Sequence, residues 1–134
     1  MIDIENELFT KIATVLRNKY SGIYVTGDYV AQPPKFPAVY ISEMDNTVNR
    51  AGRDSGDMEN YADVMYQVDV YSNRASGKRA QVKDIMATID AEFAALNFTR
   101  NFLNPVPNMN DATIYRLTGR WVATVGKDDF IYRR

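Results

Sequence analysis

The chain has 134 residues, and its 16 lysines and arginines nearly balance its 17 aspartates and glutamates, for a formal net charge of -1. This length predicts a single domain spanning residues 1–134, and the charge gives no basic footprint for nucleic acid at the level of the whole chain. Cysteine and histidine are both absent, which excludes disulfides, thiolate metal ligands, cysteine nucleophiles and serine-histidine-aspartate triads.

Membrane and export signals are also missing from the sequence. No apolar run approaches the roughly 20 residues that a membrane-spanning helix needs. The first seven residues, MIDIENE, are acidic and lack the basic and apolar regions of a signal peptide. We therefore expect a protein that is made in a cytoplasm and does not associate with a membrane.

The first predicted element is a helix over residues 3–19, because its apolar residues recur at helical spacing. Asp3 is expected to be the N-cap. Acidic side chains in the first turn and basic ones in the last turn complement the helix dipole. The apolar stripe consists of Ile4, Leu8, Ile12, Val15 and Leu16.

Two strands are predicted next, over residues 23–30 and 38–44. The segment between them, QPPKFP at 32–37, contains three prolines. Proline has no amide donor, so this segment cannot be a central strand, and we expect a rigid lead-in to the second strand.

A long, mobile loop is predicted over about residues 45–60, which are polar, carry mixed charges and show no apolar period. Loops of more than ~12–15 residues inside a compact domain are usually functional or disordered. A solvated hairpin tip remains an equal alternative. The candidate interaction residues here are Asn49, Arg50, Arg53, Asp54 and Asp57.

The centre of the chain is predicted to be one strand followed by one helix. Residues 61–71 alternate between an apolar face and a polar face, which is typical of a half-buried strand. Residues 82–96 carry apolar side chains at helical spacing, and Asn97 is expected to end the helix in a left-handed conformation. The strand's apolar face and the helix's apolar stripe must be buried, most simply against each other.

Two further strands are predicted, over residues 98–103 and 113–125, with a turn region at 104–111. In the second strand, alternate residues from Thr113 to Val125, including Trp121, are expected to face the helices, and the tail at 126–134 could pair as a short strand. The element order is thus α-β-β-loop-β-α-β-β. It predicts an α+β fold in which an antiparallel or mixed sheet has two helices on one face.

The other face of this sheet is expected to be exposed and to hold Asp63, Gln67, Asp69, Arg116 and Arg120, together with Met65 and Tyr71. Carboxylates on a sheet could hold Mg²⁺ for phosphodiester cleavage. However, Asp63 and Asp69 should lie roughly 20 Å apart at ~3.3 Å per residue, so they cannot share one metal. Cross-strand pairing of aspartate with arginine is the favoured interpretation. Asp69, Tyr71, Arg116 and Arg120 are the interaction candidates from this face.

Two motifs have weaker functional interpretations. Residues 72–79, SNRASGKR, end in a glycine-lysine pair but lack the first glycine and the final serine or threonine of a phosphate-binding loop, so an ordinary strand-to-helix turn is favoured. Nine tyrosines and one tryptophan could stack on single-stranded nucleic acid. Aromatic residues at strand spacing are more often core or interface residues.

Four segments carry a resemblance to a known family. They are FPAVYI at 36–41, YQVDVYSN at 66–73, the helix from GKRA at 77–80 to LNFTR at 96–100, and NDATIYR at 110–116, which leads into an aromatic strand and a final YRR. In this order the chain resembles the tail-terminator and head–tail joining proteins of long-tailed bacteriophages, also labelled tail completion or minor capsid proteins.

The resemblance implies a structural protein of a phage or prophage virion, without enzyme activity, cofactor or metal. Such subunits form a homo-oligomeric ring, usually a hexamer, that ends the tail tube and docks to the head connector, or stopper. DNA passes through the lumen without sequence-specific binding. The protein would be found in the virion neck, and in the host bacterial cytoplasm during assembly. The long loop at 45–60 would then contact the tube or the connector.

Two alternatives to the ring subunit remain open from the sequence. One is a generic phage tail or adaptor interaction module of similar size. The other is a metal-dependent, nuclease-like enzyme, for which the spacing of Asp63 and Asp69 provides little support.

Overall fold

The computed structural model describes residues 1–29, 32–49, 61–107, 111–126 and 131–132. The first half of the chain contains helix α1 (Glu5–Lys19) and strands β1 (Tyr24–Thr26), β2 (Ala38–Val48) and β3 (Tyr61–Ser72). The second half contains helix α2 (Lys78–Ala95) and strands β4 (Thr99–Pro105), β5 (Tyr115–Gly126) and β6 (Ile131–Tyr132).

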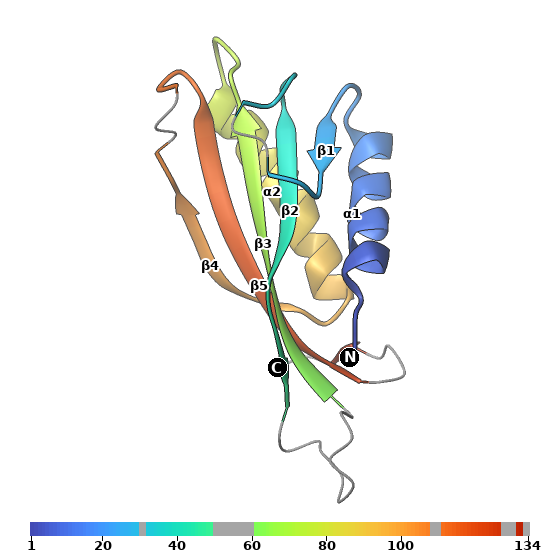
Figure 1. Cartoon of the computed structure of the whole chain (residues 1–134). Helices are drawn as coiled ribbons and strands as arrows, with labels where there is room; N and C mark the ends of the chain where they lie inside the picture. The colour runs from blue at the N-terminus through green and yellow to red at the C-terminus, as the bar shows by residue number, and fades with distance from the viewer. Residues whose placement is uncertain (30–31, 50–60, 108–110, 127–130, 133–134) are drawn as a thin grey trace, which may run out of the picture.

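All six strands belong to one mixed sheet. Five of them follow the order β1-β2-β3-β5-β4, and the short β6 pairs with β5. Among the strands that the structure describes, only β1 and β2 pair in parallel, and the other pairs are antiparallel. Both helices lie on the same side of the sheet, with α1 beside β1 at one side and α2 behind the middle strands (Figure 1). The predicted α+β fold with two helices on one face is therefore confirmed.

One hydrophobic core fills the space between the helices and the sheet. The predicted alternation holds, because Val64, Tyr66 and Val68 of β3 are buried on the helix side. Trp121 of β5 is fully buried there and stacks on Phe93 of α2, with ring centroids 4.5 Å apart. The indole N–H of Trp121 donates to the carboxylate of Asp90, 2.9 Å away, so its one polar atom is paired.

The start of α1 differs from the prediction. The N-cap residue is Ile4, which makes no side-chain capping bond, and the helix begins at Glu5. The carboxylate of Asp3 still accepts a bond from the Glu5 backbone N–H, at 3.1 Å, but from one residue outside the cap position. Asp3 thus satisfies one free N–H of the helix end without being its cap.

The strands before β3 also differ in length from the prediction. The strand expected at 23–30 is reduced to Tyr24–Thr26. The strand expected at 38–44 continues to Val48, so residues 45–48 are not part of a loop. They pair with Ala62, Asp63, Val64 and Met65 of β3 after a register shift between Glu43 and Asp45. A bulge adds one residue to β2 without ending its hydrogen-bonded pairing with β3. The polar residues that follow the bulge therefore remain part of the strand.

The C-terminal half follows the prediction closely. Asn97 adopts a left-handed conformation, with φ of 68°, directly after Leu96, the C-cap of α2. The last long strand is β5, and the short β6 pairs with its end through Thr124 and Val125. β3 pairs with one edge of β5 as far as Gly126. The short β6 therefore pairs with the other edge of β5, which it shares with β4, at residues that follow the segment paired with β4.

Candidate interaction surfaces

The sheet face that points away from the helices carries a polar band across the middle of β3 and β5, bounded at one end by the apolar pair Met65 and Val122. Gln67 and Asp69 stand opposite Arg120 and Thr118 in the strand register. The guanidinium of Arg120 donates to Gln67 at 2.8 Å, and the Gln67 amide donates to Asp69 at 3.1 Å. Because each side chain is held by its neighbour across or along the strands, the band is a fixed surface.

Asp69 lies at the centre of this band and is buried, with 1% of its surface exposed. Its Oδ1 accepts hydrogen bonds from Arg116 Nε at 3.0 Å and from the hydroxyl of Thr118. The expectation of an exposed Asp69 is therefore wrong, because its partners on β5 and Gln67 cover it. Burial lowers the pKa of Arg116, but the charge and hydrogen bond of Asp69 outweigh that effect, and the net pKa of Arg116 is raised.

Tyr71 is also buried, contrary to the expectation that it is exposed. It belongs to a second hydrophobic cluster with Ala38 and Ile114, on which Tyr40 and Phe36 pack. The lead-in segment before β2 thus covers this part of the outer face. Burial, and then the nearby Asp69 charge, raise the pKa of the Tyr71 hydroxyl to about 12.

Asp63, on the same face of β3, has its own partners. Asp63 accepts hydrogen bonds from Asn49 at 3.1 Å and from Thr124 at 2.8 Å. Asp63 and Asp69 are therefore bound by different side chains, and the structure does not bring them together around one metal. The predicted pairing of aspartate with arginine across the strands is confirmed at Asp69 and Arg116, which form an ion pair at 3.0 Å.

The candidate residues from the predicted loop divide into two groups. Asn49 lies directly after β2, is half-buried and bonds to Asp63. The other four lie outside the described residues: Arg50, Arg53, Asp54 and Asp57.

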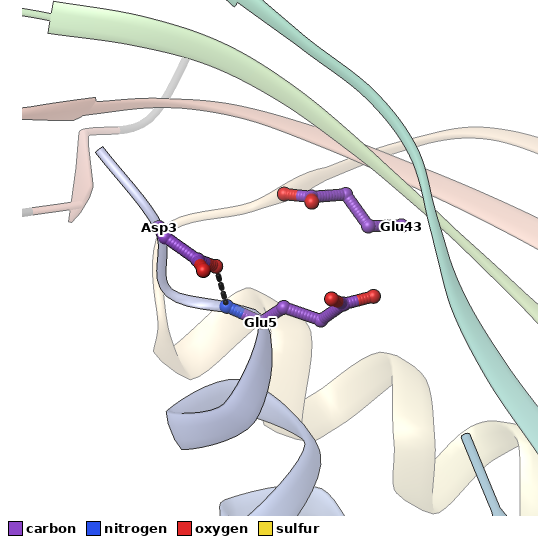
Figure 2. A group of neighbouring side chains, drawn as sticks. All are labelled: Asp3, Glu5 and Glu43. Carbon is purple, nitrogen blue, oxygen red and sulfur yellow. Dashed lines mark hydrogen bonds between the residues drawn. The ribbon is translucent and has the colours of Figure 1, made fainter. Parts of the chain in front are cut away.

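A cluster of three carboxylates was missed at the sequence level. Asp3, Glu5 and Glu43 place one carboxylate oxygen each within 4.8 Å of one another, where the start of α1 meets β2 (Figure 2). The hydroxyl of Tyr66 donates to Glu43 at 3.0 Å. Burial raises the pKa of Glu43, the Tyr66 bond lowers it, and the charges of Glu5 and Asp3 raise it again, so the net pKa is raised.

This cluster predicts a pH-dependent stability. A carboxyl with a raised folded pKa favours folding when protonated, and that contribution is lost as the pH rises from the unfolded pKa through the folded one. Glu43→Gln should therefore raise the free energy of unfolding by about 0.5 kcal/mol at pH 7, since glutamine keeps an acceptor for Tyr66 and removes the charge. Thermal unfolding at pH 7 and pH 3.5 measures this.

Two outcomes decide that prediction. The gain from Glu43→Gln should vanish at the lower pH, where the wild-type carboxyl is also neutral. The matched control is Glu7→Gln in the exposed first turn of α1, outside the cluster, which should give no gain at pH 7. A loss of stability for Glu43→Gln at pH 7 would contradict the prediction.

A groove with cationic walls lies on the helix side of the sheet, at the β4 edge, which is the edge farthest from the carboxylate cluster. There α2 leaves the helix-side face of β4 uncovered. The groove has a volume of about 640 Å³ and an apolar floor that includes Met86, Leu103 and Leu117. Arg79, Lys83 and Arg100 also line it. We refer to it below as the basic groove, and the rest of its lining consists of Ala87, Asp90, Pro105 and Tyr115.

Large exposed apolar side chains lie at the two unpaired edges of the sheet. In the described residues, β2 has a strand partner on its outer side only at residues 38–40, and β4 pairs with β5 alone. Met44 and Val48 of β2 are 49% and 46% exposed, and Leu103 of β4 is 38% exposed. Unpaired strand edges with exposed apolar side chains are typical sites of association.

Comparisons with known proteins add no relative: no protein family model matches the chain, and no curated protein is similar to it. Neither described helix is long and apolar enough to cross a membrane.

Proposed function

We propose that the chain is a structural subunit of a phage or prophage virion, which forms a ring that ends the tail tube and joins it to the head connector. In this role the protein has no catalytic activity, and its work is to present fixed surfaces to copies of itself, to the tube and to the connector. DNA would pass through the ring lumen without sequence-specific binding.

The observation that carries this proposal is the pair of unpaired edges on opposite sides of one sheet. A ring needs two different surfaces on each subunit, one for each neighbour, because a single self-complementary surface gives only a closed dimer. The β2 edge with Met44 and Val48 and the β4 edge with Leu103 supply two such surfaces. The sequence resemblance to tail-terminator and head–tail joining proteins supports the same role.

The polar band on the outer sheet face suits contact with a tube or connector. Its side chains are already hydrogen-bonded to one another, so little side-chain entropy is lost when a partner covers them. Arg116 and Arg120 also hold their guanidiniums over the rings of Tyr71 and Phe102, at 5.6 Å and 5.3 Å. Arginine with aromatic residues is a composition enriched in protein interfaces.

Deletion of the gene in the phage or prophage that encodes it tests this function. We expect filled heads without tails, and tail tubes of uncontrolled length, when particles are viewed by electron microscopy. Supplying the wild-type gene from a plasmid should restore joined particles. Normal particles after deletion would overturn the proposed function.

Removing residues 49–57 should leave the fold intact but block attachment to the tube or connector. Val48 pairs with Ala62, and the Asn49 N–H bonds to the Tyr61 carbonyl at 2.9 Å, so the two strand ends are adjacent. After the deletion, residues 58–61 can close a short hairpin loop of ordinary length. Circular dichroism and thermal unfolding test the fold, and plaque counts test attachment.

The control for this deletion is a chain in which the same residues are replaced by a glycine-serine linker of equal length. It should fold equally well and also fail to attach, because the contact depends on the side chains rather than on the length. Infectious particles in normal number from the deletion variant would contradict the expectation.

A further inference from the structure

We propose that copies of this chain associate head to tail, with the β2 edge of one copy seated on the β4 edge and the basic groove of the next. The partner is thus a second copy of the same chain. The closure of these contacts into a ring rests on the proposed function, whereas the edge-to-edge contact itself does not.

The β2 edge is acidic on its helix side. Asp3 and Glu5 are exposed and lie beside the half-buried Glu43, so three carboxylates gather at the unpaired part of β2. No cation forms an ion pair with any of them in the described part of the chain. Like charges held this close repel one another, and a neighbouring cation would relieve that repulsion.

The basic groove supplies such cations, also on the helix side of the sheet. Its single carboxylate, Asp90, is already bound, since it accepts from Arg100 at 3.0 Å and from Trp121 at 2.9 Å. Arg79 and Lys83 are exposed, and in the described residues neither forms an ion pair. Two positive charges therefore remain uncompensated beside the groove.

Apolar side chains match at the two edges as well. Met44 and Val48 are exposed at the β2 edge, and Leu103, which lines the basic groove, is exposed at the β4 edge. Contact between the edges would cover all three and bring carboxylates and cations together around them. This is the usual anatomy of a protein interface, with an apolar centre and a charged rim.

Strand direction allows the two edges to continue one sheet. β2, β3, β5 and β4 are each antiparallel to the next, so β4 runs antiparallel to β2 within one copy. A second copy in the same orientation, with its helices on the same side, places its β2 antiparallel to β4 of the first. The carboxylates and the cations then lie on the same side of the joined sheet.

The two edges also exclude a symmetric pairing. Two β2 edges would bring six carboxylates together, and two β4 edges would bring the uncompensated cations together, so each edge repels its own kind. Only unlike edges attract, which makes the contact heterologous. Such a contact repeats from copy to copy and gives a ring or a filament.

Charge reversal at each edge, and at both together, tests this contact. The first variant is Asp3→Lys with Glu5→Lys, the second is Arg79→Glu with Lys83→Glu, and the third combines all four changes. All four side chains are exposed, and the changes remove only the bond from the Glu5 N–H to Asp3 and the contact of Arg79 with the Tyr115 ring, so the fold should be retained. Native mass is measured against protein concentration up to the millimolar range, with circular dichroism as the check on folding.

We expect the wild-type chain to form an oligomer larger than a dimer, and each two-site variant to require at least about tenfold higher concentration to assemble. The four-site variant should recover the wild-type behaviour, since its reversed charges again meet their opposites. High salt should weaken the wild-type assembly and the recovered one alike. The control reverses two exposed lysines outside both edges, Lys11→Glu with Lys35→Glu, and should assemble as the wild type does.

The contact is overturned if the wild-type chain stays monomeric at every concentration, if both two-site variants assemble normally, or if the four-site variant fails to recover. These outcomes are separate from the gene-deletion test. If the oligomer forms at the same concentration in all the charge-reversal variants, the proposed contact is wrong, but the tail-joining function can still hold through a different contact. Recovery by the four-site variant, combined with normal particles after gene deletion, would keep the contact and remove the function.

Discussion

Replacing Asp69 with alanine is expected to lower the free energy of unfolding by about 3 kcal/mol, because it breaks a buried ion pair and leaves its partners behind. Asp69 is 1% exposed and accepts bonds from Arg116, Thr118 and Gln67. The Arg116 side chain is 26% exposed and can regain some hydration. The cost should therefore lie at the lower end of the range for buried pairs. Urea unfolding of both proteins measures the difference.

A double-mutant cycle identifies the origin of that loss. Adding Arg116→Ala to Asp69→Ala should cost less than Arg116→Ala costs alone, since the guanidinium no longer has a carboxylate to pair with. Thr118→Val is the matched control, because it removes one hydrogen bond to Asp69 and keeps the ion pair with Arg116, and its loss should be about 1 kcal/mol. Equal losses for Asp69→Ala and Thr118→Val would contradict the role assigned to the ion pair.

Replacing Gly119 with alanine is expected to destabilise the fold by about 2 kcal/mol through overpacking. Gly119 faces the helix side of β5, two residues before Trp121, and a Cβ atom built there would lie 2.5 Å from the indole ring. The ring cannot move easily, because it stacks on Phe93 and its N–H is bonded to Asp90. Thermal unfolding should show a midpoint lower by roughly 6 °C for a chain of this size.

Gly27→Ala is the control for this substitution. A Cβ atom at Gly27 would meet its nearest neighbour, the ring of Phe9, at 3.7 Å, which is an ordinary contact. This change should leave the unfolding midpoint within about 2 °C of the wild type, or raise it slightly by restricting the unfolded chain. If Gly119→Ala were as stable as Gly27→Ala, Trp121 would have room that the structure does not show.

The sequence by itself determined the central strand, both helices and the face of β5 that meets them. Period-two alternation at 61–71 and helical spacing at 82–96 depend only on neighbouring residues and on the geometry of each element. These patterns also predicted the class of the fold, because a strand face and a helix stripe that are both apolar must be buried against something. The left-handed end of α2 at Asn97 depended on one local preference and was predicted for the same reason.

Only the tertiary structure decided how far β2 extends and which polar residues are buried. Residues 45–48 have no apolar period, so no local pattern predicts a strand there. They form part of β2 because they pair with β3. Asp69 alternates like an exposed residue, but its partners on β5 are 47 and 49 positions away in the chain. Asp3 and Glu43 are 40 positions apart in the chain, and only the fold brings their carboxylates together. In the same way, the basic groove is lined by residues of α2, β4 and β5. Whether a polar side chain is buried, and which charged residue pairs with it, depends on the assembled sheet. A sequence pattern that depends only on neighbouring residues therefore cannot predict either property.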